Sequence, residues 1–133
     1  MVRRETAFAD AGWHCVIHYL GSDDEARALA DSLPSAEIIQ CDLADGKAGV
    51  AMIEKLAGRL DDWRVLVNNA SIFPYDDATE LDPATNKQAM QINAETPARM
   101  AQAFLTSARS RAGRSVMHIT DQKLENSNPD FFS

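Results

Sequence analysis

Two adjacent asparagines, Asn68 and Asn69, stand where an apolar run ends and are the first candidates for chemistry in this chain. The run before them, Val65–Val67, is branched and apolar, which predicts a strand buried on both faces. Ligands of open parallel sheets bind at the carboxyl ends of the strands, so both amide side chains are expected at a binding edge. Phe73 follows closely and offers a flat apolar ring to the same crevice. An ordinary strand with an Asn-rich turn is the alternative, because asparagine favours turns.

Other polar side chains also stand at the ends of expected strands. Asp42 follows the run Glu37–Cys41, and Asp121 follows Ser115–Thr120, so each carboxylate is expected at the carboxyl end of a strand. Asn93 falls within a helical pattern although asparagine is a mediocre helix former, which favours a specific role for its side chain. Each residue has a structural alternative, because the carboxylates also fit turn caps and the asparagine also fits a solvated face.

Composition restricts the class of protein. The chain has 133 residues, 45% hydrophobic and 25% charged, which is ordinary for one soluble domain. Its formal net charge of -7 argues against a general surface for nucleic acid or for an anionic membrane. No apolar run is long enough to cross a bilayer or resembles a signal peptide, so we expect a cytoplasmic protein. Cys15 and Cys41 adjoin apolar runs without metal-ligand spacing, which predicts reduced core residues and no metal site.

Helical and strand patterns alternate along the chain. The expected elements are a helix over 1–12, a strand over 15–19, a helix from 22 or 23 to 34, a strand over 37–41, a helix from 45 to 60, a strand from 65, a helix from 82 to 93, a further helix or a kinked continuation at Pro97 that ends at Gly113, and a strand over 115–120. The alternation predicts an α/β fold, a three-layer doubly wound parallel sheet with helices on both faces, within a single domain over residues 1–133.

The ordered set of these signals resembles the short-chain dehydrogenase/reductase family. Asn68-Asn69-Ala70 resembles the most recognisable internal motif of that family, and Asn93 stands on the helix that follows it. Within the family, the chain is most similar to pteridine reductases and the related dihydromonapterin and dihydrofolate reductases. That similarity rests on His18-Tyr19 with Ser22, on Asn69-Ala70-Ser71 with Phe73, and on Met117–Asp121, a strand that ends in Asp where most of the family has its catalytic Ser.

The resemblance implies a Rossmann-like sheet and an NADPH-dependent reductase that passes hydride to a pterin- or dihydrofolate-like ring. The implied catalytic residues are Asn93, which would hold a water in the proton relay, and Asp121, which would bond a pterin nitrogen or relay a proton. Phe73 would stack on the substrate ring. The implied cofactor-binding residues are His18, Tyr19, Ser22, Asp42, Leu43, Asn69, Ala70, Ser71 and Thr120.

The cofactor expected from this resemblance is NADPH, with NADH as the alternative. His18 and Ser22 would lie near the ribose 2′-phosphate, and Asp42 would lie at the adenine. An acidic residue at the end of the strand over 15–19 would indicate NADH, but the sequence there has none before Asp23.

Two parts of the family's domain do not occur in this sequence. No Gly-rich turn follows a first strand, and Arg3 and Arg4 stand near where that turn would enter its helix. The Tyr-x-x-x-Lys pair is also missing, and neither Tyr19 nor Tyr75 has its context. We therefore expect the middle of a longer reductase, truncated at both ends and inactive or nearly so by itself. The resemblance further implies a homo-tetramer for the whole protein.

Two other functions remain open from the sequence. One is a general short-chain reductase acting on a ketone or a sugar, against which Phe73 and Asp121 count. The other is a non-catalytic α/β module that binds another chain through unpaired strand edges.

Overall fold

The computed structural model of the protein describes residues 4–75 and 79–120. Contacts divide the chain into two compact units, residues 1–42 and residues 43–133, and each is described by itself.

The first unit is a short βαβ arrangement. Its elements are α1 (Arg4–Asp10), β1 (Cys15–Tyr19), α2 (Asp23–Ser32) and β2 (Ala36–Gln40). The strands pair in parallel, from Cys15 opposite Ala36 to Tyr19 opposite Gln40, and both helices contact the strands. Gly12 has φ +84°, which a glycine adopts without steric cost at the residue just past a helix.

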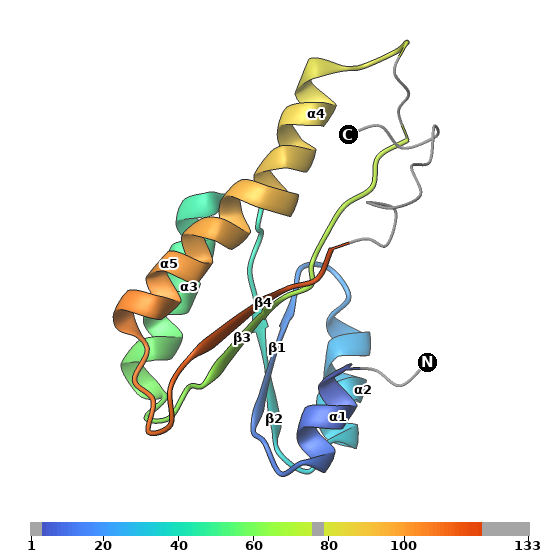
Figure 1. Ribbon diagram of the computed structural model, residues 1–133. Coiled ribbons are helices and arrows are strands. Elements are labelled where there is room, and N and C mark those ends of the chain that lie inside the picture. The colour runs from blue at the N-terminus through green and yellow to red at the C-terminus, as the bar shows by residue number, and fades with distance from the viewer. Residues whose placement is uncertain (1–3, 76–78, 121–133) are drawn as a thin grey trace. The chain divides into compact units, whose positions relative to one another are not determined.

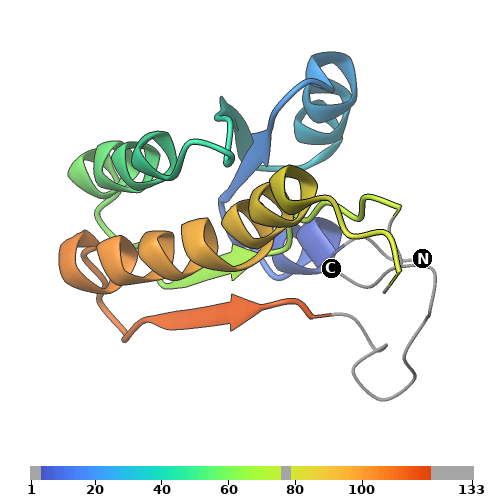
Figure 2. The ribbon, with the colours of Figure 1, turned by 90° about the horizontal axis from the view of Figure 1, so that it is seen from above.

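The second unit repeats this plan on a larger scale. Its elements are α3 (Gly46–Arg59), β3 (Val65–Asn68), α4 (Pro83–Met90), the π-helix η1 (Gln91–Glu95), α5 (Thr96–Ser107) and β4 (Ser115–His118). Strands β3 and β4 pair in parallel, from Val65 opposite Ser115 to Asn68 opposite His118. Helix α4, η1 and α5 form one continuous rod, and α3 lies alongside α5 (Figures 1 and 2).

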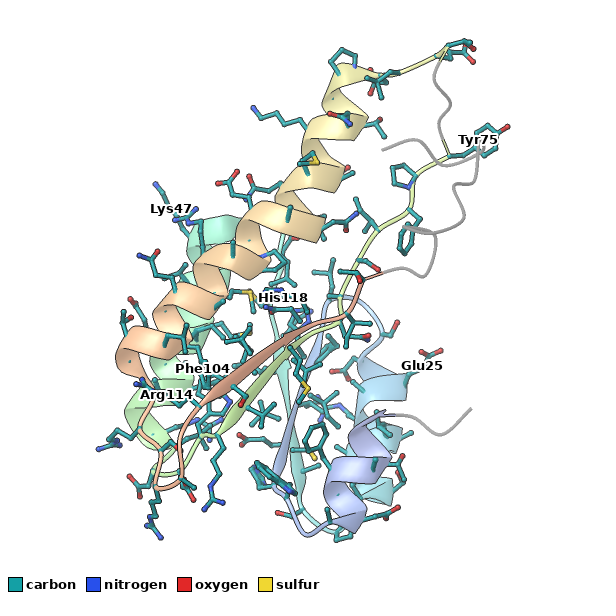
Figure 3. All side chains as sticks on the ribbon, in the orientation of Figure 1. Glu25, Lys47, Tyr75, Phe104, Arg114 and His118 are labelled. Atoms are coloured by element: carbon teal, nitrogen blue, oxygen red, sulfur yellow. The ribbon has the colours of Figure 1, made fainter. Side chains whose placement is uncertain are left out.

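The core of the second unit lies between α3, α5 and strand β3. Phe104 on α5 is fully buried, and its ring packs edge-on against Trp63 with the ring centroids 4.9 Å apart. Ile53 and Leu56 of α3 and Met100 of α5 are also buried, as is typical of the apolar face of an amphipathic helix. Figure 3 shows Phe104 between α5 and the strands.

The parallel α/β fold predicted from the sequence is confirmed, and most elements lie where the patterns place them. Strand β1 has the predicted bounds, and β2 begins and ends one residue earlier than predicted. Asp45 caps α3, because its carboxylate accepts hydrogen bonds from the amides of Lys47 and Ala48. Both cysteines are free thiols; Cys41 is buried as the prediction of a core residue requires, whereas Cys15 is only half-buried.

Two local predictions are wrong. Helix α5 ends at Ser107 rather than at Gly113, because Ala108 takes an extended conformation, and Gly113 instead supplies a positive φ in the turn before β4. The apolar run predicts that β3 is buried on both faces, but only Leu66 in it is buried. The other three residues of β3 are half-buried, and in the described part of the chain β3 pairs only with β4, whose Met117 is 43% exposed.

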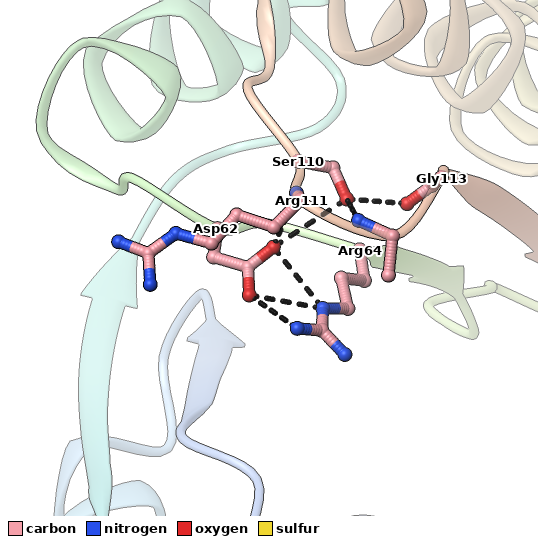
Figure 4. A network of polar contacts seen from close by, with 6 residues as sticks. Asp62, Arg64, Ser110, Arg111 and Gly113 are labelled. Atoms are coloured by element: carbon pink, nitrogen blue, oxygen red, sulfur yellow. Dashed lines mark hydrogen bonds and ion pairs between the residues drawn. The ribbon is translucent and has the colours of Figure 1, made fainter.

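A polar network joins the two connections that precede β3 and β4 (Figure 4). The carboxylate of Asp62 accepts hydrogen bonds from the Arg64 guanidinium, at 2.6 Å from Nη2, and from the Arg111 backbone amide at 2.8 Å. These bonds lower the pKa of Asp62 to about 2, the Arg64 bond having the larger effect. Ser110 extends the network through its bond to the carbonyl oxygen of Gly113.

Among the described helices, none combines the length and apolar character needed to cross a bilayer.

Candidate functional site

In the first unit, the predicted residues His18 and Tyr19 occupy the carboxyl end of β1. The Nε2 atom of His18 lies 2.7 Å from the Cys41 carbonyl oxygen, and the Cys41 amide donates to the Tyr19 carbonyl oxygen at 3.1 Å. The strand end therefore lies against Cys41, which follows β2, and the next residue, Asp42, is exposed. The His18 ring is half-buried, and its Nε2 atom is engaged with a backbone carbonyl oxygen.

Tyr19 is part of a chain of polar contacts. Its hydroxyl donates to the Asp23 carboxylate at 2.7 Å, and the Arg27 guanidinium donates to the same carboxylate at 2.6 Å. The bond to Asp23 raises the pKa of Tyr19, and the bond from Arg27 lowers the pKa of Asp23. Ser22, the first residue before α2, is exposed and makes no side-chain cap hydrogen bond.

In the second unit, the strand ends carry Asn68 and His118. The Asn68 amide nitrogen lies 3.3 Å from the Pro97 carbonyl oxygen and 3.3 Å from Nδ1 of His118. The Ile119 amide donates to the Asn68 carbonyl oxygen at 2.9 Å, which keeps the two strands together at this edge. The exposed Thr120 follows directly.

The segment after β3 presents the predicted residues to solvent. Asn69, Ala70 and Ser71 are exposed, and the Phe73 side chain is 58% exposed. Asn93 lies in the middle of η1 and holds this segment from the helix. Its Oδ1 accepts from the Ile72 amide at 2.9 Å, and its Nδ2 donates to the Ile72 carbonyl oxygen at 2.8 Å.

The structure therefore brings together some of the predicted residues within each unit. In the first, His18 and Tyr19 lie at the residues that precede Asp42. In the second, Asn93 contacts the segment that contains Asn69 and Phe73. Asp121 lies outside the described residues. The expectation that Asp42, Asn69, Phe73 and Asp121 share one rim stays a prediction.

Two residues that shape this region, Gln91 and Thr96, were missed by sequence reasoning. The Thr96 hydroxyl is fully buried, accepts from Gln91 Nε2 at 2.9 Å and donates to the Leu43 carbonyl oxygen at 2.8 Å. Gln91 and Thr96 are five residues apart, a spacing that an α-helix does not bring onto one face but a π-turn does. Pro97 is the one local signal, because its missing amide disturbs the helical ladder at this point.

An open groove of about 460 Å³ lies beside Gln91. Ala44, Ala84, Thr85, Lys87, Gln88 and Gln91 line it. None of the residues predicted from the sequence contributes to this lining, so the groove is not the predicted site. A group of His, Cys, Asp and Glu side chains suited to a metal ion does not occur among residues 4–75 and 79–120.

The family model described as Enoyl-(Acyl carrier protein) reductase matches residues 6–130. None of the curated proteins compared with the chain matches it.

Three solved structures illustrate the structural likeness. A double mutant of the Serratia marcescens short-chain dehydrogenase/reductase has a TM-score of 0.84 and 21% identity, covering 94% of this chain and 52% of that chain. The FolM alternative dihydrofolate reductase 1 of Brucella canis, complexed with NADP, has a TM-score of 0.81 and 30% identity, covering 93% and 50%. The landomycin C-6 ketoreductase LanV, with bound NADP and rabelomycin, has a TM-score of 0.84 and 23% identity, covering 96% and 55%.

This chain spans about half the length of the solved proteins that it matches. The family model, in contrast, covers nearly all of the 133 residues. The Rossmann-like α/β fold is common to the chain and to these structures. The chain therefore belongs to the short-chain dehydrogenase/reductase family, in the group whose family model is described as enoyl-(acyl carrier protein) reductase.

Proposed function

We propose that this chain is part of an NADPH-dependent oxidoreductase that transfers hydride to a pterin- or dihydrofolate-like ring. Membership in the family supports oxidoreductase chemistry. The 30% identity to a dihydrofolate reductase of the FolM type, a protein solved with NADP, supports this cofactor and this substrate class.

The observation that carries the proposal is the double hydrogen bond between Asn93 and the Ile72 backbone. It fixes the segment after β3 at the carboxyl edge of a parallel sheet, where ligands of such sheets bind. The side-chain amide of Asn93 is engaged in these bonds, so a water in a proton relay would be held by the backbone carbonyl of Asn93. Residue 97 is proline and has no amide, so this carbonyl lacks the donor that an α-helix would provide four residues later.

Two groups of predicted residues would hold the cofactor. His18, Tyr19, Ser22, Asp42 and Leu43 would contact its adenosine part. Asn69, Ala70, Ser71 and Thr120 would contact the nicotinamide part, and all four are exposed. The bound cofactor would supply the hydride.

The charges around Ser22 fit this assignment only in part. The Ser22 hydroxyl is exposed and makes no capping bond, so it is accessible to a phosphate oxygen. Arg27 is the basic side chain on the following helix, but Asp23 holds its guanidinium at 2.6 Å. Acidic residues at 23–25 occupy the first turn of α2 and offset the positive end of its dipole. NADH therefore remains the alternative cofactor.

Phe73 and Asp121 would select the substrate. The exposed Phe73 ring would stack on a flat heteroaromatic ring, and Asp121 would bond a ring nitrogen or relay a proton to it. The sequence has no Tyr-x-x-x-Lys pair, so the chain by itself is expected to show no appreciable turnover.

We further propose that residues 1–133 belong to a single dinucleotide-binding domain, and that the whole protein is a cytoplasmic homo-tetramer. The family resemblance supports this assembly, and light scattering of the purified whole protein tests it.

Cofactor protection against heating tests the proposal on the chain itself. NADP+ in large excess is expected to raise Tm by several degrees, because a ligand that binds only the folded state stabilises it. Inosine 5′-monophosphate at the same concentration controls for non-specific nucleotide effects. A Tm unchanged by NADP+ and by NAD+ would contradict cofactor binding by these residues. Rapid NADPH-dependent reduction of dihydrofolate by the chain alone would contradict its expected inactivity.

A second candidate substrate class is a ketone, the substrate class of a general short-chain carbonyl reductase. Adding dihydrofolate or a simple cyclic ketone to the NADP+ complex separates the two classes. Additional protection by the ketone alone would favour the general carbonyl reductase.

A further inference from the structure

Thr96 is the one polar residue among the buried residues of the described chain. Its hydroxyl donates to the Leu43 carbonyl oxygen at 2.8 Å and accepts from Gln91 Nε2 at 2.9 Å, so the buried oxygen is satisfied in both roles. A buried polar group left without partners costs about 1–3 kcal/mol, so removing this hydroxyl would leave the Leu43 carbonyl and the Gln91 amide poorly paired.

The π-turn is what places Gln91 against Thr96. The Thr96 backbone amide donates to the Gln91 carbonyl oxygen, five residues earlier, and the two side chains meet across the same spacing. An α-helix brings together residues three or four apart instead. The extra residue of η1 therefore aligns the side-chain pair with the buried carbonyl of Leu43.

The methyl group of Thr96 packs against helix α3. A Cβ atom built on Gly49 would lie 2.9 Å from the Thr96 Cγ2 atom, closer than real Cβ contacts allow. Helix α3 thus rests directly on Thr96 at a position without a side chain. The methyl group of Thr96 thus packs closely against α3, and its hydroxyl bonds the Leu43 carbonyl oxygen in the segment that leads into α3.

Asn93 lies in η1, the π-helix that ends just before Thr96, and it holds a different segment. It bonds both backbone groups of Ile72, in the segment after β3. Thr96, the residue that follows η1, thus contacts Leu43 at the start of the 43–46 segment, and Asn93 at the centre of η1 contacts Ile72 in the 69–73 segment.

We infer that Thr96 is a positioning residue. Its buried hydroxyl bonds the Leu43 carbonyl oxygen and the Gln91 side chain of the π-helix, and Asn93 of that π-helix bonds Ile72. Thr96 thereby holds the segment at Leu43 in a fixed place relative to the segment at Ile72. The inference rests on the proposed function, because Leu43 and Asn69–Ser71 are the proposed contacts for the two ends of the cofactor. Thr96 itself touches neither the cofactor nor the substrate in this proposal. It sets the spacing between two backbone segments that would.

Hydrogen exchange of three variants of the full chain tests this directly. Thr96→Val keeps the shape and removes the hydroxyl, whereas Thr96→Ser keeps the hydroxyl. Thr106→Val is the matched control, because the Thr106 hydroxyl bonds only carbonyl oxygens of its own helix. In Thr96→Val, amides at 44–48 are expected to exchange roughly tenfold faster and amides at 70–73 measurably faster. Thr96→Ser and Thr106→Val should stay close to the wild type in both segments.

The pattern of exchange separates positioning from a merely structural role. Uniformly faster exchange in Thr96→Val, including 65–68 and 100–105, would overturn the inference, because it would show only a loss of global stability. Unchanged exchange at 44–48 would overturn it as well. If Thr96→Val does not fold, Gln91→Met removes the donor to the hydroxyl, and it should speed exchange at 44–48 by a smaller factor.

NADP+ protection distinguishes failure of this inference from failure of the proposed function. If NADP+ protects the wild type, Thr96→Val should lose most of that protection and Thr96→Ser should keep it. Equal protection of Thr96→Val and wild type would contradict the positioning role. If NADP+ protects no variant, the proposed function fails, and the exchange pattern alone decides whether Thr96 couples the two segments.

Discussion

The side-chain amide of Asn93 donates to and accepts from the backbone of one residue, Ile72. Asn93→Ala removes both hydrogen bonds and is expected to lower the free energy of unfolding by about 1–2 kcal/mol. Urea unfolding followed by circular dichroism measures the change. Asn86→Ala on α4 is the matched control, because the same substitution there carries the same helix-propensity change. Equal effects of the two substitutions would contradict the role given to the Asn93 amide.

Phe73 is the residue on which the substrate class depends most. Its ring is 58% exposed, so stacking on a flat heteroaromatic ring would require little rearrangement of the protein. Phe73→Leu is expected to weaken dihydrofolate binding in the presence of NADP+ by up to roughly tenfold, the size of an aromatic stacking contribution. Titration calorimetry measures the affinity.

Tyr75→Leu is the control for this experiment. Tyr75 is 76% exposed in the same segment, and Figure 3 shows its side chain directed away from the helices. Its replacement should leave the affinity for dihydrofolate unchanged. A loss of affinity with Tyr75→Leu and none with Phe73→Leu would show that the stacking role does not belong to Phe73.

At the scale of elements, the contact between α3 and α5 depends on glycine. A Cβ atom at Gly49 would lie 2.9 Å from the branched methyl of Thr96, a stiff side chain that cannot easily turn aside. Gly49→Ala is therefore expected to destabilise the fold by about 1–3 kcal/mol through overpacking.

Gly58 provides the contrast on the same helix. Nothing lies within 4 Å of a Cβ atom built there, so Gly58→Ala should stabilise α3 by about 0.5–1 kcal/mol through helix propensity. Thermal unfolding of both variants gives the comparison. A stabilising Gly49→Ala would show that α3 does not rest on Thr96 as described.

At the scale of the whole molecule, acid stability depends on carboxylates paired in the folded state. The pKa of Asp62 is lowered to about 2, first by its hydrogen bonds with Arg64, and the pKa values of Asp23 and Asp82 are also lowered. A lowered folded-state pKa means that these groups stabilise the fold above about pH 4, and that this contribution is lost as pH falls towards 2.

The expected stability curve is therefore level near neutral pH and falls steeply between about pH 4 and 2. Asp62→Asn should lower stability at pH 7 and make the fall shallower, since its uncharged amide no longer titrates. Asp61→Asn is the control, because that exposed carboxylate contacts Arg109 outside the network. Urea unfolding across this pH range measures both effects, and an unaltered acid slope in Asp62→Asn would contradict the assignment.

Local patterns in the sequence predicted the elements well, for identifiable reasons. The apolar run at 15–19 gave the bounds of β1, and the caps at Asp45 and Asp82 gave the starts of α3 and α4. Such signals depend on residues that are close together in the sequence, so they can be recognised before the tertiary structure is known. The Asn-Asn-Ala sequence and Asn93 likewise indicated the family that the family model confirms.

The sequence did not reveal how the elements would meet. Pro97 indicated a kink or a new helix, and it does lie in the first turn of α5, but the π-helix that precedes it and joins α4 to α5 was not predicted. The sequence predicted that the last long helix ends at Gly113. It did not predict the turn before β4, whose Arg111 amide donates to Asp62 in the connection before β3. Whether the predicted site residues converge on one site stays a prediction, and one of them, Asp121, lies outside the described residues.

The sequence by itself determined the alternation of parallel strands and helices, and the family, because both are written in residues close together along the chain. The tertiary structure alone decided the role of Thr96. Its partner Leu43 is 53 residues away, and no local pattern records a hydrogen bond that exists only when two helices pack closely enough to bury it.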